Sequence, residues 1–239
     1  MAHGRLFLVP AWLSEDTPPA DAVPAAVLER VRALDCFVVE DAKSARRFLA
    51  ACGHPKPLRD VEMRELNEHT PRGEVAALLA PVLAGRDMGI LSEAGVPAVA
   101  DPGAALVAEA HANGVTVVPL VGPSSILLAL MASGLEGQRF RFVGYLPAEA
   151  AARRAALSDL EKRSARDRET QVFIETPYRN DAMLADVLAT CRAETRLCVA
   201  AELTSPRESI RMDRIDGWRA RHGPIGKRPA IFLLCASVT

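Results

Sequence analysis

The sequence GILSEAGVPAVADPG, residues 89–103, joins a short apolar strand to the start of a helix through a turn. The apolar run Met88 to Leu91 is too short for a helix and is typical of a buried strand. Gly95 and Pro97 interrupt the backbone pairing that a strand needs, so the chain must turn after Leu91.

A helix is predicted directly after this turn. Asp101 is a favourable N-cap residue, Pro102 suits the first helical position, and Ala104 to Asn113 carries a helical apolar pattern. In α/β sheets, ligands bind in loops that follow the carboxyl ends of strands and lead into helix N-termini. The turn is therefore a candidate binding loop, with an ordinary strand-to-helix connection as the alternative.

The rest of the chain alternates between apolar strands and amphipathic helices. The strands are expected at residues 5–9, 36–39, 88–91, 115–119, 140–145, 170–174, 197–200 and 230–235. The helices are expected at residues 24–34, 44–52, 74–83, 104–113, 126–133, 149–166 and 181–191, whereas 61–69 is ambiguous. This alternation predicts an α/β fold of parallel βαβ units, and Leu120 to Pro123 resembles a hinge. We expect two α/β domains, residues 1–119 and 120–239.

Composition narrows the class of protein. With 239 residues, 49% hydrophobic and 25% charged, the chain resembles a globular protein with sizeable cores. It contains no apolar run near the roughly 20 residues that span a bilayer, and no signal peptide pattern, so we expect a cytoplasmic protein that is not in a membrane. The cysteines and histidines lack the spacing of metal ligands, and we expect neither a disulfide nor a metal site.

Charge is distributed unevenly along the chain. Residues 1–119 hold 11 Lys and Arg against 16 Asp and Glu, whereas residues 120–239 hold 18 against 14. A basic second half is compatible with a polyanionic partner such as RNA, although a solvated surface is the better explanation of any single one of these charges.

Several segments, taken in order, resemble the motifs of the tetrapyrrole methylase family. They are Ser92-Glu93-Ala94-Gly95-Val96-Pro97 with Asp101-Pro102-Gly103 (SDAGTP and DPG), Val121 to Ser125 (PGPSA), Phe142 to Pro147 (FxGFLP), Glu175 to Arg179 (ESPxR) and Glu202-Leu203-Thr204 (ELT). Within the family, the chain is most similar to the 16S rRNA ribose 2′-O-methyltransferases. The matching motifs run in family order over nearly the whole sequence.

This resemblance implies two α/β domains with S-adenosylmethionine in the cleft between them, a methyltransferase activity and a homodimer. The cofactor-binding residues that it implies are Ser92, Glu93, Ala94, Gly95, Val96, Pro97, Ser124, Ser125, Tyr145, Leu146, Pro147, Glu175, Thr176, Tyr178 and Arg179. The implied substrate is ribosomal RNA.

Transfer of a methyl group to a ribose hydroxyl needs a group that accepts the hydroxyl proton. The candidates at strand ends are Glu40, Asp41 and Glu93, with Glu175 and Glu202 as further carboxylates. For each of the five taken alone, a structural role such as helix capping or pairing with an arginine is the alternative.

The chain departs from the rRNA subgroup in its first half. Val9 to Ser14 (VPAWLS) replaces the GTPIGN loop after the first strand, and Glu40 to Lys43 (EDAK) replaces EDTR. These changes keep two alternatives open: a methyltransferase of a tetrapyrrole or another small molecule, and a protein that binds S-adenosylmethionine without catalysis.

Overall fold

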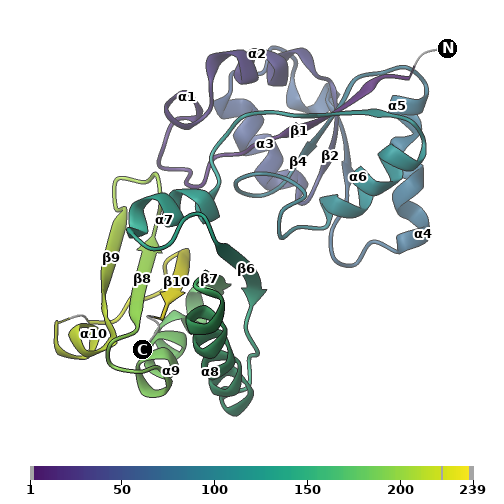
Figure 1. Cartoon of the computed structure of the whole chain (residues 1–239). Coiled ribbons are helices and arrows are strands. Elements are labelled where there is room, and N and C mark those ends of the chain that lie inside the picture. The colour runs from purple at the N-terminus through teal and green to yellow at the C-terminus, as the bar shows by residue number, and fades with distance from the viewer. Residues whose placement is uncertain (1–2, 222, 237–239) are drawn as a thin grey trace. The chain divides into compact units, whose positions relative to one another are not determined.

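The chain folds into two compact units. The computed structural model describes residues 3–221 and 223–236, and the division between the units lies between Ser124 and Ser125. Each unit contains a five-stranded sheet and packed helices (Figure 1). The predicted α/β class is therefore confirmed, whereas the domain boundary expected after residue 119 stays a prediction.

The strands of the first unit are β1 (Arg5–Val9), β2 (Cys36–Val39), β3 (Glu62–Glu65), β4 (Met88–Leu91) and β5 (Thr116–Pro119). Its helices are α1 (Pro19–Ala22), α2 (Ala25–Ala33), α3 (Ala42–Ala51), α4 (Arg72–Val75), α5 (Ala80–Leu83) and α6 (Gly103–Ala112), with 3₁₀ turns at Leu58–Asp60 and Ala76–Leu79.

All five strands of this sheet are parallel and lie in the order β3-β2-β4-β1-β5. Residues of β2 and β4 are buried throughout, as expected for central strands of a parallel sheet that helices cover on both faces. Leu28 of α2 and Phe48 of α3 belong to the core on one face of the sheet. Leu79 of the second 3₁₀ turn and Leu106 of α6 belong to the core on the other face. The parallel arrangement places the carboxyl ends of all five strands at one edge of the sheet.

The strands of the second unit are β6 (Phe140–Tyr145), β7 (Thr170–Glu175), β8 (Arg196–Ala201), β9 (Ser209–Arg214) and β10 (Ala230–Cys235). Its helices are α7 (Ser125–Ser133), α8 (Ala150–Asp167), α9 (Asn180–Thr190) and α10 (Ile215–Arg221), with a 3₁₀ turn at Pro177–Arg179.

The sheet of the second unit has the order β6-β7-β10-β8-β9, and only β6 and β7 pair in parallel. Strand β10 inserts antiparallel between β7 and β8, and β9 returns antiparallel beside β8. The expectation of parallel βαβ units is therefore wrong for β9 and β10. The connection from β8 to β9 is too short for a crossover helix, so the chain must turn back as a hairpin.

Two predicted helices differ in detail. The helix expected at residues 74–83 is broken into α4, a 3₁₀ turn and α5, because Pro81 lacks an amide hydrogen for the helical pattern. Helix α6 begins at Gly103, and its capping position is occupied by Pro102 and not by Asp101, the expected N-cap. Asp101 still serves the helix start, since its carboxylate accepts a hydrogen bond from the Gly103 amide.

All five cysteines are buried and free. Burial raises the pKa of the Cys52, Cys191 and Cys198 thiols to about 12. None of the helices in the described part of the chain is both long and apolar enough to cross a membrane.

Candidate functional site

The loop that follows β4 is tied to the loop that follows β1. The Ala11 amide donates a hydrogen bond of 2.8 Å to the Gly95 carbonyl, which forms an isolated antiparallel bridge. Gly95 has a φ of +73°, which favours glycine. A Cβ on Gly95 would lie 3.3 Å from the Leu13 side chain and 3.6 Å from the Pro123 carbonyl oxygen. The segments before Ser124, after β1 and after β4 therefore meet at Gly95.

The second half of this loop is strained. Ala98 and Ala100 have φ values of +66° and +60°, in the left-handed region that alanine rarely adopts. The Asp101 carboxylate supports this turn by accepting hydrogen bonds from the amides of Ala98 (2.8 Å) and Gly103 (2.7 Å). Strained backbone of this kind clusters at binding and catalytic sites, because the surrounding structure must hold it in place.

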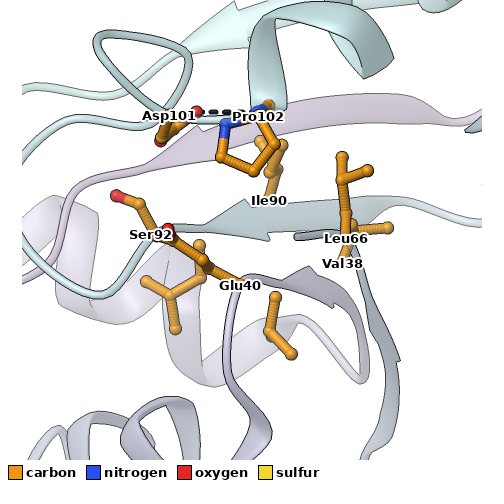
Figure 2. Close-up of a pocket in the computed structure, with 10 residues that line it drawn as sticks. Val38, Glu40, Leu66, Ile90, Ser92, Asp101 and Pro102 are labelled. Atoms are coloured by element: carbon orange, nitrogen blue, oxygen red, sulfur yellow. Dashed lines mark hydrogen bonds between the residues drawn. The ribbon is translucent and has the colours of Figure 1, made fainter. Parts of the chain in front are cut away.

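A small cavity lies beneath the loop, at the carboxyl ends of β2 and β4 (Figure 2). Its volume is about 10 Å³, which is enough for about one water molecule. Glu40, Ser92 and Asp101 contribute polar groups to it, and Val38 and Ile90 contribute apolar ones. Burial raises the pKa of Asp101, while the hydrogen bonds from Gly103, Ala98 and Ser92 oppose this rise.

The three candidate carboxylates at this edge have different partners. The Asp41 side chain caps α3 by accepting a hydrogen bond of 2.7 Å from the Ser44 amide, and this bond lowers the pKa of Asp41. Glu40 accepts a bond of 3.2 Å from the Glu93 amide. The Glu93 carboxylate has no hydrogen-bond partner among the described residues. Partial desolvation of this exposed carboxylate, followed by the negative charges of Glu40 and Asp41, raises the pKa of Glu93, and Arg47 opposes this.

A second set of candidate residues lies in the second unit, at the ends of β6 and β7. Because these strands are parallel and Tyr145 pairs with Ile174, the segments Tyr145–Pro147 and Glu175–Arg179 leave the sheet at the same edge. The pairing between Phe142 and Tyr145 is irregular, and Tyr145 is 59% exposed. Leu146 is buried in the core of this unit, whereas Ser125 is the first residue of α7.

Glu175 is held by its own segment. Its Oε1 accepts hydrogen bonds from the Thr176 amide (2.6 Å) and from Arg179 Nε and Nη2 (2.9 and 2.6 Å). Its Oε2 is buried without a partner among the described residues. Tyr178 is 80% exposed, and Lys227 Nζ lies 5.3 Å from the centre of its ring.

Glu202 is likewise committed to arginines. Its carboxylate pairs with Arg207 at 2.9 Å and with Arg228 at 3.7 Å, which favours a structural role for this residue.

The candidate residues thus form one set on each unit. The structure brings Ser92 to Pro97 together with Glu40 and with the segment before Ser124, and it brings residues 145–147 together with residues 175–179. The contact between the loops after β1 and β4 was not predicted, because no local pattern signals a hydrogen bond between loops distant in sequence. The assignment of either set to a cofactor stays a prediction.

Comparisons with known proteins agree over most of the chain. Residues 19–216 match the family model of the tetrapyrrole (corrin/porphyrin) methylases. The chain is 33% identical to the ribosomal RNA small subunit methyltransferase I of Pseudomonas aeruginosa, over 88% of this chain and 70% of that protein. It is 34% identical to the protein of the same name from Mycobacterium tuberculosis, over 92% of this chain and 74% of that protein.

Two solved structures share the fold. The methyltransferase CobJ superimposes with a TM-score of 0.65 at 16% identity, over 98% of this chain and 94% of CobJ. The uroporphyrin-III-C-methyltransferase from Thermus thermophilus gives a TM-score of 0.55 at 19% identity, over 97% of this chain and 92% of that one.

Proposed function

The chain belongs to the tetrapyrrole methylase family and is a methyltransferase that uses S-adenosylmethionine, and from this premise we propose that its acceptor is a ribose 2′-hydroxyl of small-subunit ribosomal RNA. The observation that carries the proposal is the identity of 33–34% with proteins named ribosomal RNA small subunit methyltransferase I over about nine-tenths of this chain. The structural relatives named for tetrapyrrole chemistry share the fold at only 16–19% identity.

The residues fit the cofactor on two counts. The loop after β4 follows the carboxyl end of a buried parallel strand and leads into the start of α6, which is where α/β sheets bind ligands. Glu175 offers a buried carboxylate oxygen without a partner, which could accept a hydrogen bond from a ligand N–H group. In this proposal the cofactor contacts Ser92 to Pro97, Ser124, Ser125, Tyr145 to Pro147 and Glu175 to Arg179.

When bound, S-adenosylmethionine supplies a methyl group on a sulfonium, which is displaced in line without a metal or a covalent intermediate. The protein must therefore position the acceptor, keep water out and take up a proton.

We assign the uptake of the proton to Glu93. Asp41 caps a helix, Glu175 and Glu202 are held by arginines, and Glu40 binds the Glu93 amide. Glu93 is the candidate whose carboxylate remains without a partner among the described residues, and its raised pKa makes it a stronger base than an ordinary glutamate.

We further propose that the protein works in the cytoplasm as a homodimer, as the resemblance implies. Light scattering during gel filtration measures the oligomeric state directly, and a monomeric mass at micromolar concentration would contradict the dimer.

The proposed activity is tested by incubating the protein with methyl-labelled S-adenosylmethionine and small ribosomal subunits that lack the modification. We expect label in the RNA and, after digestion to nucleosides, a 2′-O-methylated nucleoside identified by mass spectrometry. Heat-treated protein is the negative control. Label on a base, or no label in RNA from a protein that binds the cofactor, would contradict the proposed acceptor.

A tetrapyrrole acceptor is the second candidate, and the match of residues 19–216 to the tetrapyrrole (corrin/porphyrin) methylase model favours it. It is tested in parallel with a uroporphyrin-type macrocycle in place of the ribosomal subunits. Thermal protection and methylation by the macrocycle would support this candidate over the first.

A further inference from the structure

A second and larger cavity lies in the first unit beside Glu93 and Ala94. Its volume is about 250 Å³, and three segments form it: Trp12 to Glu15 after β1, Ser44 and Arg47 of α3, and Glu93-Ala94 after β4. We call it the Trp12 cavity. It is formed by the loop in which this chain departs from the GTPIGN pattern, so it reflects residues particular to this sequence.

Trp12 is held in place but remains partly accessible. Its ring packs edge-to-face against the buried Phe48, with 5.6 Å between ring centres and an angle of 75° between the ring planes. This packing fixes the indole, while the accessible part of the ring lines the cavity. Exposed aromatic rings of this kind are the platforms on which proteins stack the bases of single-stranded RNA.

The polar groups around the cavity are mostly acceptors. Glu15 pairs with Arg47 at 2.8 Å, and both side chains are about half exposed, so Arg47 orients the Glu15 carboxylate without using all its acceptor sites. The Glu93 carboxylate, which has no hydrogen-bond partner within the described part of the chain, also lines the cavity. With two carboxylates and one arginine, this lining disfavours a phosphate group and favours a neutral group that donates hydrogen bonds.

We propose that the Trp12 cavity receives a base of the acceptor RNA that carries an exocyclic amino group, stacked on Trp12 with its amino group donating to Glu15. Carboxylates accept hydrogen bonds from such amino groups in base recognition. The cavity lies slightly below the range of about 300–1,000 Å³ typical of ligand pockets, which suits a single base and not a macrocycle. Glu93, the proposed proton acceptor, lines the same cavity and therefore lies beside the bound nucleotide. This inference rests on the proposed function.

The two tryptophans of the chain make the test direct. Trp218 is fully buried in the core of the second unit, and its indole nitrogen donates to the Leu197 carbonyl. A base that stacks in the Trp12 cavity should therefore quench the emission of Trp12 alone. The probes are the single-stranded ribohexamers of adenosine, cytidine and uridine, the last of which lacks an exocyclic amino group.

We expect the adenosine and cytidine hexamers to quench the emission of the parent protein, and the uridine hexamer to bind more weakly. Trp12→Leu keeps apolar bulk against Phe48 but removes the stacking ring, and it should weaken binding of fluorescein-labelled hexamers by roughly 10-fold or more in anisotropy titrations. Trp12→Phe keeps an aromatic ring and should recover most of the affinity. Glu15→Gln should reduce the preference for adenosine and cytidine over uridine.

Each contrary result overturns the inference. The inference fails if the hexamers bind the parent without quenching or do not bind it at millimolar concentration. It also fails if Trp12→Leu binds them with the parental affinity, or if the parent shows no preference against the uridine hexamer. The labelled-methyl assay on ribosomal subunits separates this test from that of the proposed function: hexamer quenching by a protein that methylates no ribosomal RNA would overturn the function and not the cavity. Methylation of ribosomal subunits at the parental rate by Trp12→Leu would overturn the cavity alone.

Discussion

Glu93 in the first unit and Glu175 in the second are the same kind of residue in the sequence: each follows the end of an apolar strand and lies in a family-like motif. The structure separates them. Glu93 is exposed, its carboxylate has no partner among the described residues, and its pKa is raised. Glu175 is only 4% exposed and binds Arg179 and the Thr176 amide. A carboxylate at a strand end is therefore available for chemistry only when no arginine in its own segment holds it.

The two sheets explain this difference. In the first unit every strand is parallel, so the carboxyl ends of the five strands and the loops that follow them lie at one edge of the sheet. There Glu40, Asp41 and Glu93 come close enough to affect one another. In the second unit the antiparallel strands β9 and β10 distribute strand ends to both edges, and charged groups pair as they are buried. We therefore expect mutations of acidic residues to affect mainly activity in the first unit and mainly stability in the second.

The largest effect is expected from Asp186→Ala in the second unit. Asp186 pairs with Arg153, which is 5% exposed, and with Arg154, so its loss leaves a buried arginine unpaired. We expect the free energy of unfolding to fall by about 3–5 kcal/mol in denaturant titrations. Asp159→Ala in α8, the helix that also carries Arg153, is the matched control, because its pair with Lys162 is exposed and contributes about 0–1 kcal/mol. Equal effects of the two variants would contradict the structural role of the buried pair.

The next effect is on catalysis. Glu93→Gln removes the proposed proton acceptor and should lower kcat for ribosomal subunits by about 100-fold, which corresponds to about 2.7 kcal/mol. The melting temperature should not fall, since no hydrogen bond of the Glu93 carboxylate is lost within the described structure. A kcat equal to that of the parent in this variant would show that Glu93 does not take up the proton, and it would contradict the expectation that acidic residues of the first unit act mainly on activity.

Glu175→Gln should show the opposite pattern. Loss of the charge-assisted bonds to Arg179 is expected to cost about 1–3 kcal/mol in stability, measured by denaturant titration. Because Glu175 is also proposed to contact the cofactor but not to take up the proton, we expect the KM for S-adenosylmethionine to rise and kcat to stay within a few-fold of the parent. A loss in kcat as large as that of Glu93→Gln, without loss of stability, would break the comparison.

The smallest effect concerns pH. Since the pKa of Glu93 is raised above its ordinary value of 4.5, the methylation rate of the parent should fall on acidification with an inflection above that value. The folded state holds this proton more tightly than the unfolded state, so the associated stability is present at acidic pH and lost as pH rises through the folded pKa. Glu93→Gln should therefore be at least as stable as the parent at pH 7. A greater stability of the parent at pH 7 would contradict a raised pKa.

Much of the fold could be predicted from the sequence, because central strands such as Cys36–Val39 and Met88–Leu91 are continuous apolar runs. The edge strands could not. Strand β9, Ser209–Arg214, was not predicted and β3, Glu62–Glu65, was ambiguous, because both carry charged residues and are only partly buried. The insertion of β10 between β7 and β8 depends on contacts distant in sequence, which no local pattern reports.

The candidate site was predictable to a similar extent. The positions of Glu40 and Ser92 at one edge follow from parallel strands, and Gly95 marks the turn. The second role of Asp101, which holds the strained Ala98 as well as the helix start, depends on the exact path of the loop. The Trp12 cavity depends on the contact of the loops after β1 and β4, so its residues could be identified only in the folded chain.

The most direct measurement is a calorimetric titration of S-adenosylmethionine into the parent, Gly95→Trp and Gly114→Trp. Both glycines have a positive φ, near +70°, but Gly95 lies against Leu13 in the candidate loop, whereas nothing lies within 4 Å of a Cβ on Gly114. The two variants therefore share the backbone strain and differ in position. We expect binding by the parent and by Gly114→Trp and none by Gly95→Trp. No binding by a folded parent, or unchanged binding by Gly95→Trp, would contradict a cofactor site at this loop.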